Sequence, residues 1–275
     1  MKFFTLQVNH LKKNTDKAIE IGFEIPDAYK NEFQYISGQF VIVKLSIDNK
    51  EYQREYSIFT APQENLLRIC VKAVEGGIVS NYLLNNLQEN ATLSISTPLG
   101  KFGKIDFLNT QKIVCIAAGS GISPVLSNLK EALFQEPNAK VLLFFGNKDS
   151  QNILLKEELD ALKERFPERF QVTHVLSREP QEDTLFEGRI TTEKLGQLLD
   201  KNFEIKPEDS TFFICGPTEM IKSTSDFLKK ERKVPALQVL YEYFSAPDDE
   251  DNAEMSEEFK KIPNLESFVT LIIDD

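Results

Sequence analysis

The sequence predicts two domains of different class: an antiparallel β-barrel over residues 1–103, then a doubly wound α/β domain with a parallel sheet over residues 104–245. The first part consists of short β-rich runs bounded by Pro, Gly, Asn and Asp, which are typical of antiparallel sheets. After Gly103 strand-like and helix-like segments alternate, as in parallel sheets covered by helices. At 275 residues and 41% apolar composition, the chain can bury a core in each domain.

The strands of the first domain are expected where β-branched and apolar residues gather between turn residues. One helix interrupts them over residues 79–87, with Tyr82, Leu83, Leu84 and Leu87 forming its apolar face. The expected strands cover residues 3–8, 18–26, 38–45, 54–60, 66–72 and 91–96.

The second domain opens with a continuous apolar run over residues 112–118, the kind of strand that a parallel sheet buries on both faces. Ligands of such domains bind at the carboxyl ends of the strands. Further strands are expected over residues 140–145, 170–176, 210–215 and 234–243, and helices over residues 122–134, 154–166, 191–199 and 220–230.

Composition excludes several function classes. The net charge of −11 argues against nucleic-acid binding, which needs a basic surface. No apolar run has the length of a membrane span and the N-terminus has no signal-peptide pattern, so a cytoplasmic location is expected. Cys70, Cys115 and Cys215 are too widely spaced for a metal site and give no even disulfide set.

A first candidate site is the stretch Arg54-Glu55-Tyr56-Ser57. Side chains alternate along a strand, so Arg54 and Tyr56 share one face, and Glu55 and Ser57 share the other. A guanidinium beside an aromatic ring suits a ligand with a phosphate at one end and a flat ring nearby. Ordinary surface packing of the Arg/Tyr pair is the alternative.

A second candidate is the start of the helix after Gly76 and Gly77, with Val79 and Ser80 in its first turn. Free backbone N–H groups and the positive end of the helix dipole make such a terminus suitable for a diphosphate. A glycine turn followed by a simple N-cap is the alternative.

A third candidate is the strand-to-helix turn Gly119-Ser120-Gly121-Ile122-Ser123-Pro124, whose glycines allow a pyrophosphate to approach the backbone. It departs from the full dinucleotide fingerprint because its sixth residue is Pro124. The next strand ends in Gly146-Asn147-Lys148, without an acid for a ribose 2′-hydroxyl. A missing acid beside cations favours a cofactor with a 2′-phosphate.

Together with Cys215-Gly216-Pro217, these motifs resemble the ferredoxin–NADP reductase superfamily: Arg-x-Tyr-Ser, Gly-x-x-Ser, Gly-x-Gly-x-x-Pro and Cys-Gly-Pro in that order. The resemblance covers roughly the first 245 residues. It is greatest to reductase components of bacterial oxygenases, such as that of phenylacetyl-CoA epoxidase.

The resemblance implies an FAD site in the first domain. Arg54 and the turn from Gly77 to Ser80 would hold the flavin diphosphate, and Tyr56 would lie against the ribityl chain and the isoalloxazine ring. Ser57 would hydrogen-bond near flavin N5. The flavin ring would also receive backbone groups from the strand residues Cys70, Val71 and Lys72.

For the second domain the resemblance implies NADPH, with NADH possible. Ser177 and Arg178 resemble the pair that holds the NADP 2′-phosphate, and Lys148 would add a cation; a surface ion pair of Arg178 with Glu179 or Glu182 is the alternative. The nicotinamide would lie near Ser123 and Cys215. Further residues implied at the two cofactors are Asn147, Gly216, Pro217, Glu242 and Phe244.

The implied reaction is hydride transfer from NAD(P)H to FAD, with Ser57, Cys215 and Glu242 as catalytic residues and no metal site. Single electrons would then pass to an iron–sulfur protein or domain serving a terminal oxygenase. A free flavin or quinone reductase, and a non-catalytic flavin-binding subunit, are the alternatives. Residues 246–275 would be an acidic linker and the first strand of a [2Fe–2S] ferredoxin domain that the present chain lacks.

Overall fold

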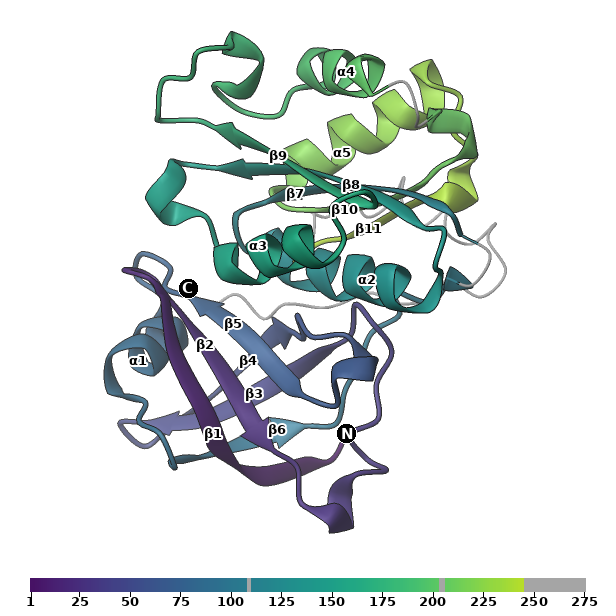
Figure 1. The fold of residues 1–275 in the computed structure, drawn as a ribbon. Helices are drawn as coiled ribbons and strands as arrows, with labels where there is room; N and C mark the ends of the chain where they lie inside the picture. The colour runs from purple at the N-terminus through teal and green to yellow at the C-terminus, as the bar shows by residue number, and fades with distance from the viewer. Residues whose placement is uncertain (108–109, 203–205, 245–275) are drawn as a thin grey trace.

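The computed structural model describes residues 1–107, 110–202 and 206–244. It contains two stacked domains, a barrel that carries the N-terminus and a layered α/β domain (Figure 1). The linker and strand predicted for residues 246–275 lie outside the described residues, so that prediction is not tested.

The barrel strands are β1 (Phe3–Thr15), β2 (Ala18–Glu24), β3 (Phe40–Ile47), β4 (Lys50–Ser57), β5 (Leu67–Lys72) and β6 (Thr92–Ser96). They form one antiparallel sheet in the order β4-β3-β6-β1-β2-β5. A bridge between Ile58 and Ile69 joins the two end strands, so the sheet curls into a barrel. Every second residue, such as Ile19 and Ile21 of β2, points into the barrel core.

The α/β domain is built on the strands β7 (Lys112–Ala118), β8 (Lys140–Asn147), β9 (Phe170–Leu176), β10 (Thr211–Cys215) and β11 (Val239–Glu242). All pairs are parallel, in the order β11-β10-β7-β8-β9. The helices are α2 (Ile122–Gln135), α3 (Lys156–Arg165), α4 (Thr192–Lys201) and α5 (Thr218–Asp226).

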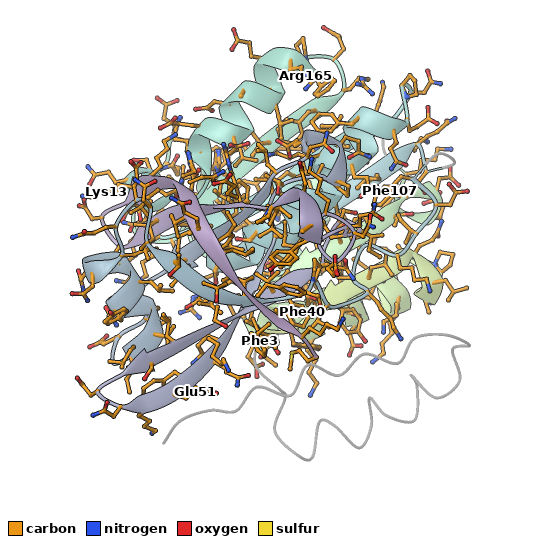
Figure 2. All side chains as sticks on the ribbon, turned by 90° about the horizontal axis from the view of Figure 1, so that it is seen from below. Phe3, Lys13, Phe40, Glu51, Phe107 and Arg165 are labelled. Carbon is orange, nitrogen blue, oxygen red and sulfur yellow. The ribbon has the colours of Figure 1, made fainter. Side chains whose placement is uncertain are left out.

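The helices cover both faces of this sheet, which confirms the doubly wound prediction. On β7, Cys115 packs with α2 and α3, whereas Val114 and Ile116 pack with α4 and α5. The first of these two layers lies between the sheet and the barrel (Figure 1), and barrel residues such as Phe59 and Cys70 share its core. Figure 2 looks from the barrel side, with Glu51 on the β3–β4 hairpin and Arg165 at the end of α3 in the other domain.

Several element boundaries differ from the prediction. β1 runs to Thr15 and not to residue 8, because it continues to pair with β2 beyond its pairing with β6. β4 starts after a hairpin turn with positive φ at Asp48 and Asn49 and ends at Ser57, because the chain then leaves β3 to bridge β5. β11 has only four residues, since Pro235 and a 3-10 turn over Ala236–Gln238 precede it. The last helix starts at Thr218 and continues through a π turn over Phe227–Glu231.

Candidate active site at the domain interface

Strand β4 presents the first candidate residues as its alternation predicts. Ser57 is buried opposite Phe40 of β3, whereas Arg54 and Tyr56 are half-buried. Burial raises the pKa of the Tyr56 hydroxyl, so this ring stays neutral. Arg54 Nη1 donates to the Gln53 carbonyl at 2.7 Å.

The second candidate lies at the start of α1 (Ile78–Asn86), which contacts both β4 and β5. Its N-cap is Gly77, which has no side chain to accept from the first-turn N–H groups. Ser80 Oγ instead accepts from Val74 N at 3.2 Å and holds the preceding loop against the helix. Gly76 has φ of +75° and open space around it. The turn therefore offers backbone donors to an anion.

The third candidate turn packs directly against the Cys-Gly-Pro turn. A Cβ added at Gly121 would lie 2.2 Å from the Cys215 carbonyl oxygen, and one at Gly216 would lie 3.2 Å from Ala118 Cβ. Only glycine permits this approach of two backbones. Ser123 and Pro124 are buried in the first turn of α2, beside this contact, and Pro217 is the N-cap of α5. The structure thus brings the ends of β7 and β10 together.

Glu242 lies beside Cys215 in the register of β11 and β10. Its Oε2 is buried without a hydrogen-bond partner among the described residues. Burial, together with the Glu55 carboxyl across the domain boundary, raises the pKa of this carboxyl to about 8. Burial also raises the pKa of the Cys215 thiol, which excludes a thiolate nucleophile at neutral pH. Phe244 packs on the same apolar core as α2.

Glu55 is a residue whose role the sequence analysis missed. Desolvation raises the pKa of its half-buried carboxyl to about 7. It shares a strand face with Ser57 and acts electrostatically on Glu242, so two carboxyls from different domains approach each other. The alternation along residues 54–57 was the available signal.

The side chain of Lys72, at the end of β5, is the second missed feature. A Cβ added at Gly119 would lie 3.5 Å from Lys72 Nζ, so this barrel lysine reaches the turn of the other domain. Burial lowers the pKa of Lys72, and the charges of Lys148 and Lys17 lower it further. Lys72 therefore brings a positive charge to the turn, and Lys148 and Lys17 lie close enough to act on it. Cys70 and Val71 of the same strand are buried.

The ends of β8 and β9 also meet. Ser177 N donates to the Asn147 carbonyl at 2.9 Å, and Arg178 N donates to the Lys148 carbonyl at 2.7 Å. Arg178 is exposed, and within the described residues it forms no ion pair with Glu179 or Glu182. Glu179 instead accepts from Ser150 N at 2.7 Å. A surface pair therefore does not account for Arg178.

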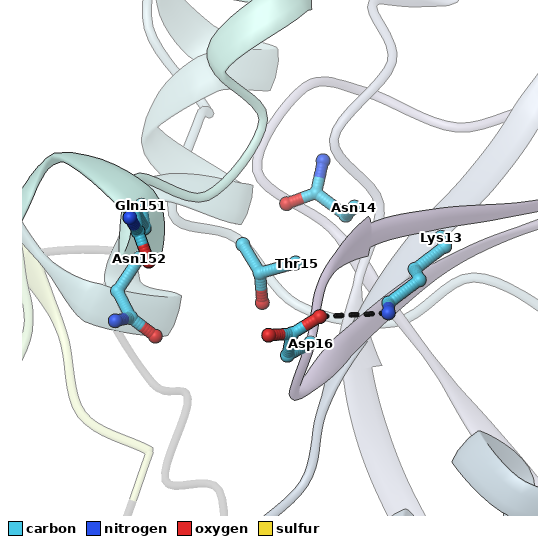
Figure 3. Close-up of a pocket in the computed structure, with 6 residues that line it drawn as sticks. All are labelled: Lys13, Asn14, Thr15, Asp16, Gln151 and Asn152. Carbon is cyan, nitrogen blue, oxygen red and sulfur yellow. Dashed lines mark ion pairs between the residues drawn. The ribbon is translucent and has the colours of Figure 1, made fainter.

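A separate polar groove opens between the β1–β2 hairpin and the short turn Ser150–Asn152 (Figure 3). It is lined by Lys13, Asn14, Thr15, Asp16, Gln151 and Asn152, with Lys13 paired to Asp16 at 2.7 Å. Ligand pockets are mostly apolar with a few polar groups. The residues that line this groove are all polar or charged, and none of them belongs to the candidate sites above.

Both histidines have structural surroundings. His10 lies 3.7 Å from the buried Glu20, and His174 packs against the Phe145 ring with its pKa lowered by burial. Among the described residues no helix is long and apolar enough to cross a membrane, and no cluster of His, Cys, Asp and Glu forms a metal site.

The residues present fit a flavin dinucleotide and a nicotinamide dinucleotide. Arg54 and the uncapped start of α1 offer charged and backbone donors to one diphosphate, and the Gly119–Gly121 turn with Lys72 offers them to another. Glu242 Oε2, which is buried without a partner among the described residues, is a polar atom that a bound ligand would satisfy.

Comparison with protein-family models supports both halves. Residues 6–103 match the oxidoreductase FAD-binding domain and residues 115–226 match the oxidoreductase NAD-binding domain. These ranges contain the motifs of β4, α1, β7 and β10.

Two curated relatives are similar over most of this chain. One component of 1,2-phenylacetyl-CoA epoxidase from Escherichia coli K12 is 33% identical over 228 residues, 82% of this chain and 64% of the relative. The ferredoxin reductase component of 3-ketosteroid-9-alpha-monooxygenase from Rhodococcus rhodochrous is 31% identical, over 77% of this chain and 57% of the relative. The chain thus spans less than two thirds of the length of each.

A solved ferredoxin NADP⁺ reductase from Neisseria gonorrhoeae, with bound FAD and NADP, has the same fold, with a TM-score of 0.72 and 22% identity over 89% of this chain and 99% of that chain. Both domain matches, the curated relatives and the shared fold lead to one conclusion. The chain belongs to the ferredoxin reductase family of FAD- and NAD-binding oxidoreductases.

Proposed function

We propose that this protein is a cytoplasmic reductase that takes hydride from NAD(P)H onto FAD and passes single electrons to an iron–sulfur acceptor serving an oxygenase. The observation that supports it best is the approach of Lys72, at the end of the barrel strand β5, to the Gly119 turn of the α/β domain. Bound FAD supplies the exchange between two-electron and one-electron chemistry.

The residues of the chain bind and orient in this proposal. Arg54 and the α1 terminus hold the flavin diphosphate, and Tyr56 stacks on the flavin. Ser57 would donate a hydrogen bond near N5. The Gly119–Gly121 turn and Lys72 would hold the pyrophosphate of the nicotinamide cofactor, with the nicotinamide directed towards Cys215.

Glu242 holds a proton at its carboxyl in the buried end of this site. With a pKa of about 8, it is mostly protonated at neutral pH and can donate a hydrogen bond. Glu55 opposes its ionisation, because a second negative charge across the interface is unfavourable.

The proposed preference for NADPH rests on Arg178 and Lys148 at the ends of β9 and β8. Arg178 has no ion pair with its acidic neighbours in the described part of the chain, so its guanidinium group is available to bind a phosphate. An iron–sulfur acceptor is supported by the relatives, which are components of oxygenase systems.

Anaerobic titration tests the first step. Stoichiometric NADPH should bleach the flavin absorbance, and NADH should do so less efficiently. A bound flavin that keeps its absorbance with both cofactors would identify a binding subunit rather than a reductase.

A coupled assay tests the acceptor. Cytochrome c reduction should be slow with the protein alone and should rise at least tenfold when a plant-type [2Fe–2S] ferredoxin is added. Fast reduction of free flavin or quinone, without any effect of the ferredoxin, would favour the alternative reductase.

A further inference from the structure

Helix α2 carries five buried polar side chains, and three of them, Ser127, Lys130 and Glu131, are 0%, 1% and 7% exposed. Their spacing of three and four residues places them side by side on the helix surface. This face lies against the barrel, in the layer between the two domains (Figure 1). Buried polar groups need partners, and the barrel supplies partners to these three side chains.

Two of the three residues bind barrel backbone. Ser127 Oγ donates to the Thr60 carbonyl at 2.6 Å, and Glu131 Oε2 accepts from Ser37 N at 3.2 Å. Because these contacts fix α2 to the barrel at two separate loops, they restrict both its position and its rotation.

Lys130 is the centre of the contact. Its Nζ lies 3.1 Å from both carboxyl oxygens of Glu64 in the barrel and 2.7 Å from Glu158 Oε2 in α3. It also lies 5.5 Å from the centre of the Phe59 ring. Glu64 is itself held, since its Oε2 accepts from Ala61 N at 2.6 Å. One buried cation thus joins three segments from both domains.

The segments joined by Lys130 lead directly to the two proposed cofactor sites. In the barrel, the segment from Thr60 to Glu64 begins three residues after Ser57, the last residue of β4. At its other end α2 follows the Gly119–Gly121 turn without a break. The distance between β4, which carries the candidate flavin residues, and the Gly119–Gly121 turn is therefore set through α2.

We propose that Lys130, with Glu64 and Glu158, is a positioning residue for hydride transfer. It fixes the position of α2 relative to the barrel, so that the nicotinamide can lie against the flavin. The inference rests on the hydride transfer of the proposed function but not on the identity of the acceptor. Reacting atoms must lie about 3–3.5 Å apart, and a displacement of about 1 Å can cost about a hundredfold in rate.

Stopped-flow reduction of the FAD-loaded full chain by NADPH tests the role with Lys130→Met, which keeps the length of the side chain and removes its charge. The limiting rate of flavin reduction should fall at least about tenfold. The Kd values of FAD and NADPH should stay within about threefold, since no binding group is changed. A positioning role predicts this split between rate and affinity, whereas general destabilisation does not.

Lys12→Met is the matched control. Lys12 also crosses the interface, 2.6 Å from Glu157 Oε2, but this pair is exposed to solvent. Its limiting rate should stay within about twofold of wild type. A wild-type rate in Lys130→Met, or a loss matched by weaker FAD or NADPH binding, overturns the inference.

Two further measurements keep the test decisive. If Lys130→Met does not fold, Glu158→Gln is the second variant, since it keeps the Lys130–Glu64 pair. It should slow flavin reduction about threefold to tenfold, and a wild-type rate in this variant overturns the inference.

In the FAD-free protein, hydrogen exchange of residues 60–64 and of α2 should be at least tenfold faster in Lys130→Met than in Lys12→Met. Equal exchange in the two variants contradicts the proposed contact. A wild-type chain that NADPH cannot reduce would instead overturn the proposed function.

Discussion

The two regions of the domain interface differ in how their buried ionisable side chains are satisfied. Along α2, Lys130 and Glu131 have charged or backbone partners from the barrel and from α3, although Asn128 Oδ1 and Ser37 Oγ beside them have none among the described residues. At the strand ends, Glu242 Oε2 has no partner among the described residues, and the Glu55 carboxyl opposes its ionisation. Paired charged groups hold domains together, whereas a buried carboxyl without a partner needs another explanation, such as a bound ligand. The paired region is therefore structural, and the strand ends are the candidate functional region.

Substitution in the satisfied region should give the largest loss of stability. Lys130→Met leaves Glu64 and Glu158 facing each other, and breaking a buried pair in this way costs about 3 kcal/mol when its carboxylates are partly exposed. Lys12→Met should cost less than about 1 kcal/mol, because its pair is exposed to solvent. Chemical denaturation of the FAD-free proteins measures both. Equal small losses would show that the α2 contacts are not structural.

Substitution at the candidate flavin diphosphate site should instead change binding. Arg54→Ala removes a charge-assisted contact to the flavin diphosphate, worth about 1.5–3 kcal/mol, and should weaken FAD binding about tenfold to a hundredfold. The unfolding free energy of the FAD-free protein should change by less than about 0.5 kcal/mol.

Fluorescence titration of FAD gives the Kd of the Arg54→Ala variant. Lys50→Ala, at the other end of β4, is the control and should bind FAD like wild type. Unchanged FAD affinity in Arg54→Ala would show that another residue holds the phosphate.

The raised pKa of Glu242 predicts a dependence on pH. Its pKa increases from 4.5 in the unfolded chain to about 8 in the folded protein, so between these values the folded state binds more protons. The contribution to stability is therefore fully present below about pH 4.5 and is lost as pH rises towards 8.

Glu242→Gln should remove this dependence. At about 1.4 kcal/mol per pKa unit, halved for coupling with Glu55, the wild-type FAD-free protein should lose about 2 kcal/mol between pH 5 and pH 8. The variant should show a flatter profile and greater stability at pH 8. Denaturation at several pH values measures this, and parallel profiles for both proteins would contradict the burial of an uncompensated carboxyl.

The sequence predicted the fold and the strand-end residues, because both follow from local patterns. Residues 112–118 are apolar on both faces, as a central parallel strand requires, and parallel strands place the turns after Ala118 and Cys215 side by side. β11 was predicted too long because its Pro235 lies inside a run of otherwise strand-forming residues.

The contacts between domains were not predictable in this way. Lys130 occupies a position on α2 where periodicity places a solvated lysine, and only the packing of the barrel buries it. Lys72 and Glu55 belong to barrel strands whose exposed faces look like ordinary surface. Their proximity to Gly119 and Glu242 depends on how two domains dock, which hydrophobic periodicity within either domain does not encode.

The smallest expected effect distinguishes two cations at the dinucleotide site. Arg178 lies at the end of β9 and Lys72 lies at the Gly119 turn, so one should contact the 2′-phosphate and the other the pyrophosphate. Only NADPH carries the 2′-phosphate, whereas both nicotinamide cofactors carry the pyrophosphate.

Arg178→Ala should raise KM for NADPH about tenfold, or about 1.4 kcal/mol, and leave KM for NADH nearly unchanged. Lys72→Met should raise KM about threefold to fivefold for both. Steady-state kinetics with ferricyanide as acceptor give all four values, and equal losses for both cofactors in Arg178→Ala would mean that Arg178 contacts a part common to both.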